Sequence, residues 1–241
     1  MGKGRLAMAV LVGAEARRYL ERYPVERMFS APVGQYLSVH RIPRGEHLFR
    51  GDADANRLYF LVEGRAKTYI LHPNGSESLL AFPGPGTVMG DMELVGARTE
   101  PYLVQALTDC VAVTLALALC RETVLADPAF LLRLCRLMAD KLYAEDGRLS
   151  AQQAFPLLPK LADFILRTQA EGLYTEPLVS TAKYLGASER QLQRLLVRLC
   201  GEGALARLGR SRYRVEDRDR LRELAGEMNR FQEAGGFLQF L

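Results

Sequence analysis

The hydrophobic pattern of this 241-residue chain changes once, near Asp127. Before that point, between residues 36 and 120, short apolar runs alternate with turn sequences. Short strands at such regular spacing are typical of a β-sandwich or a barrel-like roll. At Asn74-Gly75 we expect a tight type I′ hairpin, because both residues accept a positive φ. The expected strands are YLSVHRI, LYFLVEG, AKTYILH, SLLAF, YLVQAL and VAVTLAL.

Asp127-Pro128 predicts the start of a long helix, with an N-cap followed by proline at the first helical position. Apolar residues then recur at helical spacing as far as about residue 153, and Gly147 is a candidate break. These apolar residues form a stripe along one side of the helix. The stripe packs either on the β domain or along the same helix of a second copy of the chain, and we expect packing against a second copy. The residues of the stripe are Leu131, Leu134, Met138, Leu142 and Leu149.

Residues 177–215 predict two helices joined by a tight turn, followed by a hairpin. The first helix covers about Ser180 to Tyr184, and Gly186 supplies the positive φ that a sharp turn needs. Ser188 caps the second helix, which runs to about Cys200. Such a pair is a helix-turn-helix unit, and the hairpin around residues 208–211 has the position of a wing.

The second helix and the hairpin carry concentrated positive charge. Residues 186–215 contain seven arginines and two glutamates, a net charge of +5, whereas the whole chain carries +4. Arginines near the start of a recognition helix can bond guanine with two hydrogen bonds, and basic patches contact phosphates. The alternative is an ordinary solvated helix pair with basic edges. The candidate DNA-binding residues are Ser188, Glu189, Arg190, Gln191, Gln193, Arg194, Arg198, Arg210 and Arg212.

Four segments, taken in order, resemble the Crp/Fnr superfamily of bacterial transcription regulators. They are RGEHLFRGD (44–52), LYFLVEGRAKTYILHPNG (58–75), GTVMGDMEL (86–94) and YLGASERQLQRLLVRLCGEGAL (184–205). The resemblance implies an α+β fold with an N-terminal double-stranded β-helix, jelly-roll-like, that senses an effector. A long dimerisation helix and a winged helix-turn-helix domain follow. The expected domains are 1–126, with an N-terminal helix, then 127–154, and then 155–241, which ends in a helical tail.

The same resemblance implies a homodimer joined through residues 128–153 that binds double-stranded, pseudo-palindromic DNA. RNA polymerase is a further candidate partner. Arg190 stands where many members carry glutamate, so we expect an operator that differs from the common half-sites of the family. Whether transcription is raised or lowered stays open.

Cyclic-nucleotide-binding relatives hold the ribose with a G-E pair and, about ten residues later, the phosphate with an R-S or R-T pair. Gly90-Asp91 matches the first pair, but Glu100 and Pro101 stand at the second, and a carboxylate repels phosphate. We therefore expect an unknown effector that is not a cyclic nucleotide. The alternative is a re-registered loop in which Arg98-Thr99 binds the phosphate. The candidate effector-binding residues are Gly90, Asp91, Met92, Glu93, Arg98, Thr99 and Glu100.

The sequence contains no motif typical of a metal site, an enzyme active site or a membrane span. The four cysteines form no CxxC pair and the three histidines no HxH or HExxH group, so we expect no metal and no cofactor. We expect no enzyme either, because there is no Ser/His/Asp group, Cys/His group or phosphate loop. No apolar run reaches the length of a membrane span, and we expect a cytoplasmic protein that binds no membrane.

Two alternatives concern other parts of the chain. The roll could instead belong to a cupin-like ligand- or metal-binding protein whose C-terminal helices dock something other than DNA. The tail, residues 225–241, begins as an amphipathic helix and ends in the apolar sequence GGFLQFL. That end either packs on a neighbouring subunit or frays, and the sequence does not choose between these.

Overall fold

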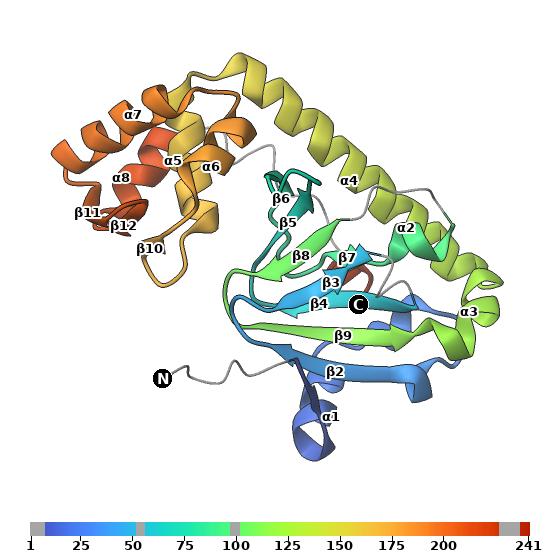
Figure 1. The fold of residues 1–241 in the computed structure, drawn as a ribbon. Coiled ribbons are helices and arrows are strands. Elements are labelled where there is room, and N and C mark those ends of the chain that lie inside the picture. The colour runs from blue at the N-terminus through green and yellow to red at the C-terminus, as the bar shows by residue number, and fades with distance from the viewer. Residues whose placement is uncertain (1–7, 52–55, 97–101, 227–236) are drawn as a thin grey trace. The chain divides into compact units, whose positions relative to one another are not determined.

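The computed structural model describes residues 8–51, 56–96, 102–226 and 237–241 (Figure 1). It divides into two compact units. The roll unit contains Met1–Leu71, Pro83–Asp140 and Gly235–Leu241, and the helical unit contains His72–Phe82 and Lys141–Ala234. Because the chain passes from one unit to the other more than once, each unit is described by itself.

Two antiparallel sheets form the roll. The first has the order β1-β2-β9-β4-β7, and the second has the order β3-β8-β5-β6. The last strand, β6, lies in the His72–Phe82 segment that belongs to the helical unit. All six expected strands form, at β2, β4, β5, β6, β8 and β9, which confirms the jelly-roll-like half of the α+β fold. The bounds are β1 Ala9–Leu11, β2 Leu37–Ile42, β3 His47–Arg50, β4 Arg57–Glu63, β5 Ala66–Leu71, β6 Glu77–Ala81, β7 Val88–Met89, β8 Leu103–Ala106 and β9 Cys110–Ala116.

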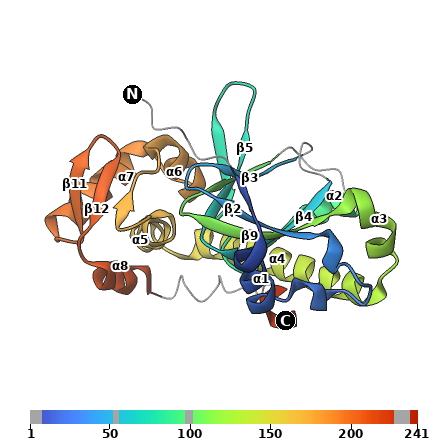
Figure 2. The same cartoon turned by 90° about the horizontal axis from the view of Figure 1, so that it is seen from below.

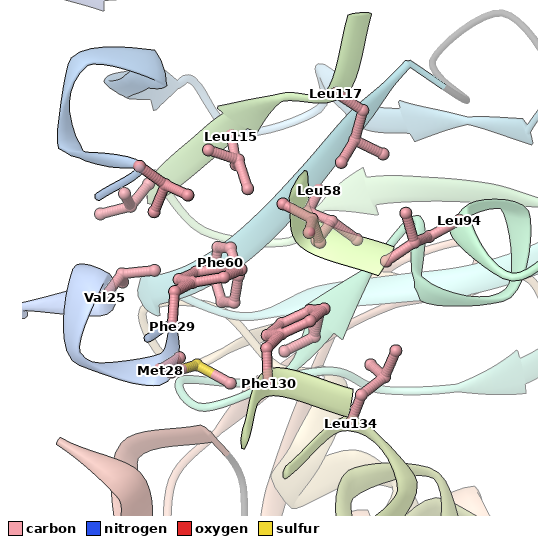
Figure 3. Packing of buried hydrophobic residues seen from close by; sticks show 14 of the residues in the cluster. Val25, Met28, Phe29, Leu58, Phe60, Leu94, Leu115, Leu117, Phe130 and Leu134 are labelled. Atoms are coloured by element: carbon pink, nitrogen blue, oxygen red, sulfur yellow. The ribbon is translucent and has the colours of Figure 1, made fainter. Parts of the chain in front are cut away.

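Alternating side chains give the first sheet two buried faces. Ile42, Leu61 and Ala112 pack toward Phe49 and Val104 of the second sheet. The opposite face packs on helices, and Figure 3 shows Phe60, Leu58 and Leu115 there. Phe29 stacks on Phe130 with ring centroids 4.4 Å apart and meets Phe60 edge-on at 6.4 Å. The roll therefore has a core on each side of its first sheet.

Helices of the roll unit, including the long helix as far as Asp140, cover that second core. Leu131, Leu134 and Met138 of the expected stripe pack on this core, so the expectation that they face a second copy is wrong, whereas Leu142 and Leu149 are exposed. Between β9 and the long helix lies α3, a helix that the sequence pattern did not indicate. The bounds are α1 Gly13–Arg22, η1 Val25–Met28, η2 Gly34–Tyr36, α2 Asp91–Leu94, α3 Leu117–Leu125, α4 Pro128–Ala154 and η5 Phe237–Phe240.

The long helix α4 begins where the sequence predicts. Asp127 Oδ1 accepts hydrogen bonds from the backbone N–H groups of Ala129 at 3.0 Å and Phe130 at 3.1 Å, as an N-cap does. The helix continues without interruption through Gly147, so the expectation of a break there is wrong. One glycine costs a helix only about 1 kcal/mol relative to alanine, which 27 residues of helix tolerate.

The turn after β5 differs from the expected type I′ hairpin. Gly75 N–H bonds His72 C=O at 2.9 Å and His72 N–H bonds Ser76 C=O at 2.9 Å, so the loop has three residues. Of Asn74 and Gly75, only the glycine has a positive φ. Pro73 explains the difference, because its fixed negative φ favours a type I turn followed by a left-handed glycine.

The helical unit contains the expected helix-turn-helix pair and hairpin. A third strand, β10, which the sequence pattern did not indicate, joins the hairpin in a sheet of order β10-β12-β11. Its buried residues include Phe164, Tyr174 and Leu196. No helix in the described part of the chain is long and apolar enough to cross a membrane. The bounds are α5 Leu157–Thr168, β10 Leu173–Tyr174, α6 Leu178–Leu185, α7 Glu189–Gly201, β11 Leu205–Gly209, β12 Arg212–Val215 and α8 Arg218–Ala225.

Candidate nucleic-acid interface and effector site

The turn between α6 and α7 is fixed by local hydrogen bonds. Gly186 ends α6 with φ 64°, the left-handed conformation that glycine tolerates, and Ala187 N–H bonds Ala182 C=O at 2.9 Å. Ser188 then begins α7 with a capping box. Gln191 N–H donates to Ser188 Oγ at 3.3 Å, and Ser188 N–H donates to Gln191 Oε1 at 3.0 Å. The two helices are therefore joined by a short turn with paired backbone groups.

Helix α7 separates an apolar face from a polar one. Leu192, Leu196 and Leu199 are buried, whereas Glu189, Arg190, Gln193 and Arg194 are exposed. Within the described residues, neither Arg190 nor Arg194 bonds another side chain or a backbone group. Their guanidinium groups are thus free to meet an external acceptor.

Three of the predicted DNA-binding residues have partners inside the helical unit. The side chains of Ser188 and Gln191 are engaged in the capping box. Arg198 Nε bonds Glu202 Oε1 at 2.6 Å, and Arg220 approaches the same carboxylate at 3.7 Å. The hydrogen bond from Arg198 lowers the pKa of Glu202, which stays charged. Because these bonds already use some of their donors and acceptors, Gln191 and Arg198 have fewer hydrogen-bonding groups left for DNA.

The hairpin of β11 and β12 follows α7 directly (Figure 2). Arg210 and Arg212 are exposed at its tip, and neither has a partner within the part of the chain that the structure describes. Ser211, between them, has φ 53°. The tip therefore presents two unpaired guanidinium groups, which is the charge a wing needs to contact phosphates.

The exposed face of α7 contains one candidate contact residue that the sequence analysis did not identify. Val197 lies three residues after Arg194 and is 61% exposed, although it is apolar. At that spacing it shares the exposed face of α7. An apolar group there can contact a thymine methyl group. Helical spacing counted from Arg194 identifies this position, but the predicted DNA-binding residues are all polar or charged.

The candidate effector site is built on the short helix α2. Gly90 precedes it with φ 84°, and a Cβ at this position would overlap the backbone oxygen of Arg57. Only glycine fits there, since both the backbone angle and the space exclude a side chain. Asp91 is buried at 1% exposure, and Met92 is exposed. Arg121 of α3 donates to the backbone oxygens of Glu93 at 2.9 Å and Leu94 at 2.7 Å, which ties α2 to α3.

The described part of this site is acidic and aromatic. Tyr102 stacks on Phe49 with ring centroids 5.0 Å apart. Burial raises the pKa of Tyr102, and the nearby carboxylates of Glu93 and Asp91 raise it further. Arg98, Thr99, Glu100 and Pro101 lie outside the described residues.

No group of three or more His, Cys, Asp or Glu residues within the described ranges is placed to hold a metal ion. Each histidine bonds a hydroxyl group, His40 that of Ser38 at 3.0 Å and His47 that of Tyr69 at 2.9 Å. His72 bonds Ser78 at 2.7 Å. Cys110 and Cys120 are buried, Cys200 is partly buried and Cys135 is exposed.

A β-roll, a long helix and a winged helix-turn-helix define an architecture that known proteins share. The family model of the cyclic nucleotide-binding domain matches residues 39–125. Solved structures with this fold include a CRP-family regulator from Thermus thermophilus, at TM-score 0.57 and 22% identity over 77% of this chain and 96% of that one. A Crp/Fnr-family regulator from Eubacterium rectale gives TM-score 0.64 and 17% identity over 86% of this chain and 97% of that one.

The curated relatives point to one family. The regulatory protein YeiL of Escherichia coli O157:H7 is 35% identical over 182 residues, which are 76% of this chain and 83% of YeiL. The CRP-like cAMP-activated global transcriptional regulator of Mycobacterium tuberculosis is 25% identical over 79% of this chain and 80% of its own length. This chain belongs to the Crp/Fnr superfamily.

Proposed function

We propose that this protein is a homodimeric, sequence-specific DNA-binding transcription regulator that acts in the cytoplasm. The main support for this proposal is the exposed face of α7, where Arg190 and Arg194 have no partners among the described residues. The basic tip of the wing adds to it. The positions fit the two kinds of contact that specific DNA binding needs. Arginines near the start of α7 read base edges, and Arg210 and Arg212 contact phosphates.

The direct test is a gel shift of the purified protein on the DNA upstream of its own gene, with a salt titration. Since Arg190, Arg194, Arg210 and Arg212 occur twice in a dimer, we expect affinity to fall at least about a hundredfold between about 50 and 200 mM salt. No retardation at micromolar protein in low salt would overturn the proposal. A competitor DNA of shuffled sequence separates specific from general binding.

We propose further that the effector is not a cyclic nucleotide. The partly buried Glu93 and the buried Asp91 place negative charge beside Tyr102 in the described part of the site, which suits a neutral or cationic metabolite better than a phosphate. Cyclic AMP added to the gel shift should leave operator affinity unchanged. A saturable change in affinity would instead assign the phosphate to Arg98-Thr99, the alternative that the sequence leaves open.

The proposed dimer rests on the exposed side of α4. Exposed positions along this helix follow the alternating four- and three-residue spacing of a coiled-coil seam. Leu142 is 65% exposed, a large apolar side chain that water does not stabilise. Covering the seam with the same seam of a second copy buries these side chains. The positions are Leu132, Cys135, Ala139, Leu142, Asp146, Leu149 and Gln153.

Cys135 gives the seam a chemical test. In a parallel two-fold coiled coil each Cys135 faces its counterpart, so a short bismaleimide should join the wild-type protein into covalent dimers on a reducing gel. Cys135→Ser should abolish the product, whereas the matched variant Cys200→Ser should keep it. Absence of a covalent dimer, at a concentration where gel filtration shows dimers, would place the interface elsewhere.

A further inference from the structure

The C-terminal segment, residues 237–241, belongs to the roll unit, whereas α8, the helix that precedes it in the sequence, belongs to the helical unit. Its short helix η5 contacts η1, and Phe240 and Leu241 pack against the core that contains Val25 and Met28. Figure 2 shows this end of the chain, marked C, on the side of the roll unit that carries α1 and α4. The segment therefore packs on the roll unit of its own chain, so the expectation that it packs on a neighbouring subunit or frays is wrong. Residues 227–236 of the tail lie outside the described residues.

Two hydrogen bonds add to the apolar contact. The Arg27 guanidinium donates to the backbone oxygen of Leu241 at 3.0 Å. The Gln239 side-chain amide donates to Asp140 Oδ2 at 3.3 Å. The first bond joins the segment to η1 and the second joins it to α4. We call η1 and residues 137–140 of α4 the seat of the C-terminal segment.

The seat is itself held in place. Arg133 of α4 donates to the backbone oxygens of Arg27 at 2.9 Å and Met28 at 2.6 Å, which fixes η1 on the long helix. Directly after η1, Asp127 Oδ2 accepts from the backbone N–H of Ala31 at 3.2 Å and from that of Ser30. A segment that docks on a preformed surface loses less entropy than one that must order its own site.

This docking has a consequence for chain connectivity. The chain leaves the roll unit after Asp140, and residues 237–241 belong to the roll unit again. The bond between Asp140 and Gln239 places the points of exit and return next to each other on the roll unit. The helical unit is thus anchored at both ends, and residues 226–236 after α8 can span at most about 40 Å.

We propose that residues 237–241 act as a latch: they dock on the seat of their own chain and restrict the motion of the DNA-binding unit. The DNA part of this inference rests on the proposed function. A dimer must hold its two recognition helices at the separation of the two half-sites. Because the latch already restricts the motion of the DNA-binding unit, operator binding loses less conformational entropy.

The test compares three full-length proteins with the wild type. Arg27→Ala removes the bond to Leu241 but keeps the backbone oxygen that Arg133 uses, and Phe240→Ser with Leu241→Ser removes the apolar contact. Arg22→Ala is the matched control, because this exposed arginine pairs with Glu63 at 3.2 Å and not with the C-terminal segment. Each protein is measured by hydrogen exchange over residues 226–241 and by operator affinity.

We expect faster exchange in both latch variants, a wild-type rate in Arg22→Ala, and operator affinity weakened about threefold to tenfold in the latch variants alone. Unchanged exchange would overturn the docking itself. Faster exchange with unchanged or tighter operator binding would overturn the restraint. If the wild type binds no DNA, the proposed function fails, whereas the exchange rates still decide whether the segment docks.

Discussion

Asp127→Ala is expected to lower the free energy of unfolding of the roll unit by about 2 to 4 kcal/mol. One carboxylate oxygen caps α4 through Ala129 and Phe130, and the other accepts the backbone N–H groups of Ser30 and Ala31. Alanine leaves four backbone donors without their acceptor in a largely buried site. Calorimetry of the thermal transitions measures the loss.

Asp217→Ala is the matched control. Asp217 also caps a helix, but its side chain accepts a single bond, from Arg220 N–H at 2.8 Å, at an exposed site. The control should cost about 1 kcal/mol or less. Equal losses in the two variants would show that Asp127 acts only as a cap and does not hold the segment after η1.

The loss at Asp127 also depends on pH. Burial alone would raise the pKa of this carboxyl group, but bonds from the backbone of Phe130, Ser30 and Ala31 outweigh burial and lower it. A lowered folded-state pKa stabilises the protein fully above the unfolded value of about 3.9. The difference between wild type and Asp127→Ala should therefore be constant near neutral pH and shrink as the pH falls through the folded-state pKa.

Arg194→Ala is expected to weaken binding to the cognate operator by about 1 to 3 kcal/mol and to relax base preference at one position of each half-site. The side chain is exposed near the start of α7 and has no partner among the described residues, so the loss reports contact with DNA. Binding profiles on a randomised operator library measure both effects.

Arg194→Lys separates base reading from charge. Lysine keeps the positive charge but not the planar fork that meets guanine O6 and N7, so base preference should relax while the salt dependence stays. Arg222→Ala is the control, since Arg222 lies on α8 and pairs with Asp219 at 2.6 Å. A lysine variant with wild-type specificity would assign Arg194 to a phosphate.

The sequence predicted those features of the fold that depend on local patterns. Six strands, the start of α4 and the helix pair follow from hydrophobic period, capping residues and Gly186, all of which act over a few residues. The strands β1, β3, β7 and β10 were not predicted, because runs of two to four residues show no clear period by themselves. The turn type predicted at Asn74-Gly75 was wrong, because the fixed negative φ of Pro73 favours a different turn.

Contacts between distant residues could not be predicted. The sequence around Arg198 does not show whether its guanidinium group contacts DNA or bonds Glu202. The docking of Leu241 on Arg27 joins positions 214 residues apart. In the candidate effector site, the sequence indicated an acidic loop, but the tie from Arg121 to α2 required the structure.

The capping box of α7 limits how the DNA preference of this protein can be redesigned. Ser188 and Gln191 hold the start of the helix through reciprocal bonds, so randomising either residue would change helix stability together with base reading. A library aimed at new operators should vary Arg190, Gln193 and Arg194, together with Val197, and keep the two capping residues constant. Selected clones then differ in what they contact and not in whether the helix forms.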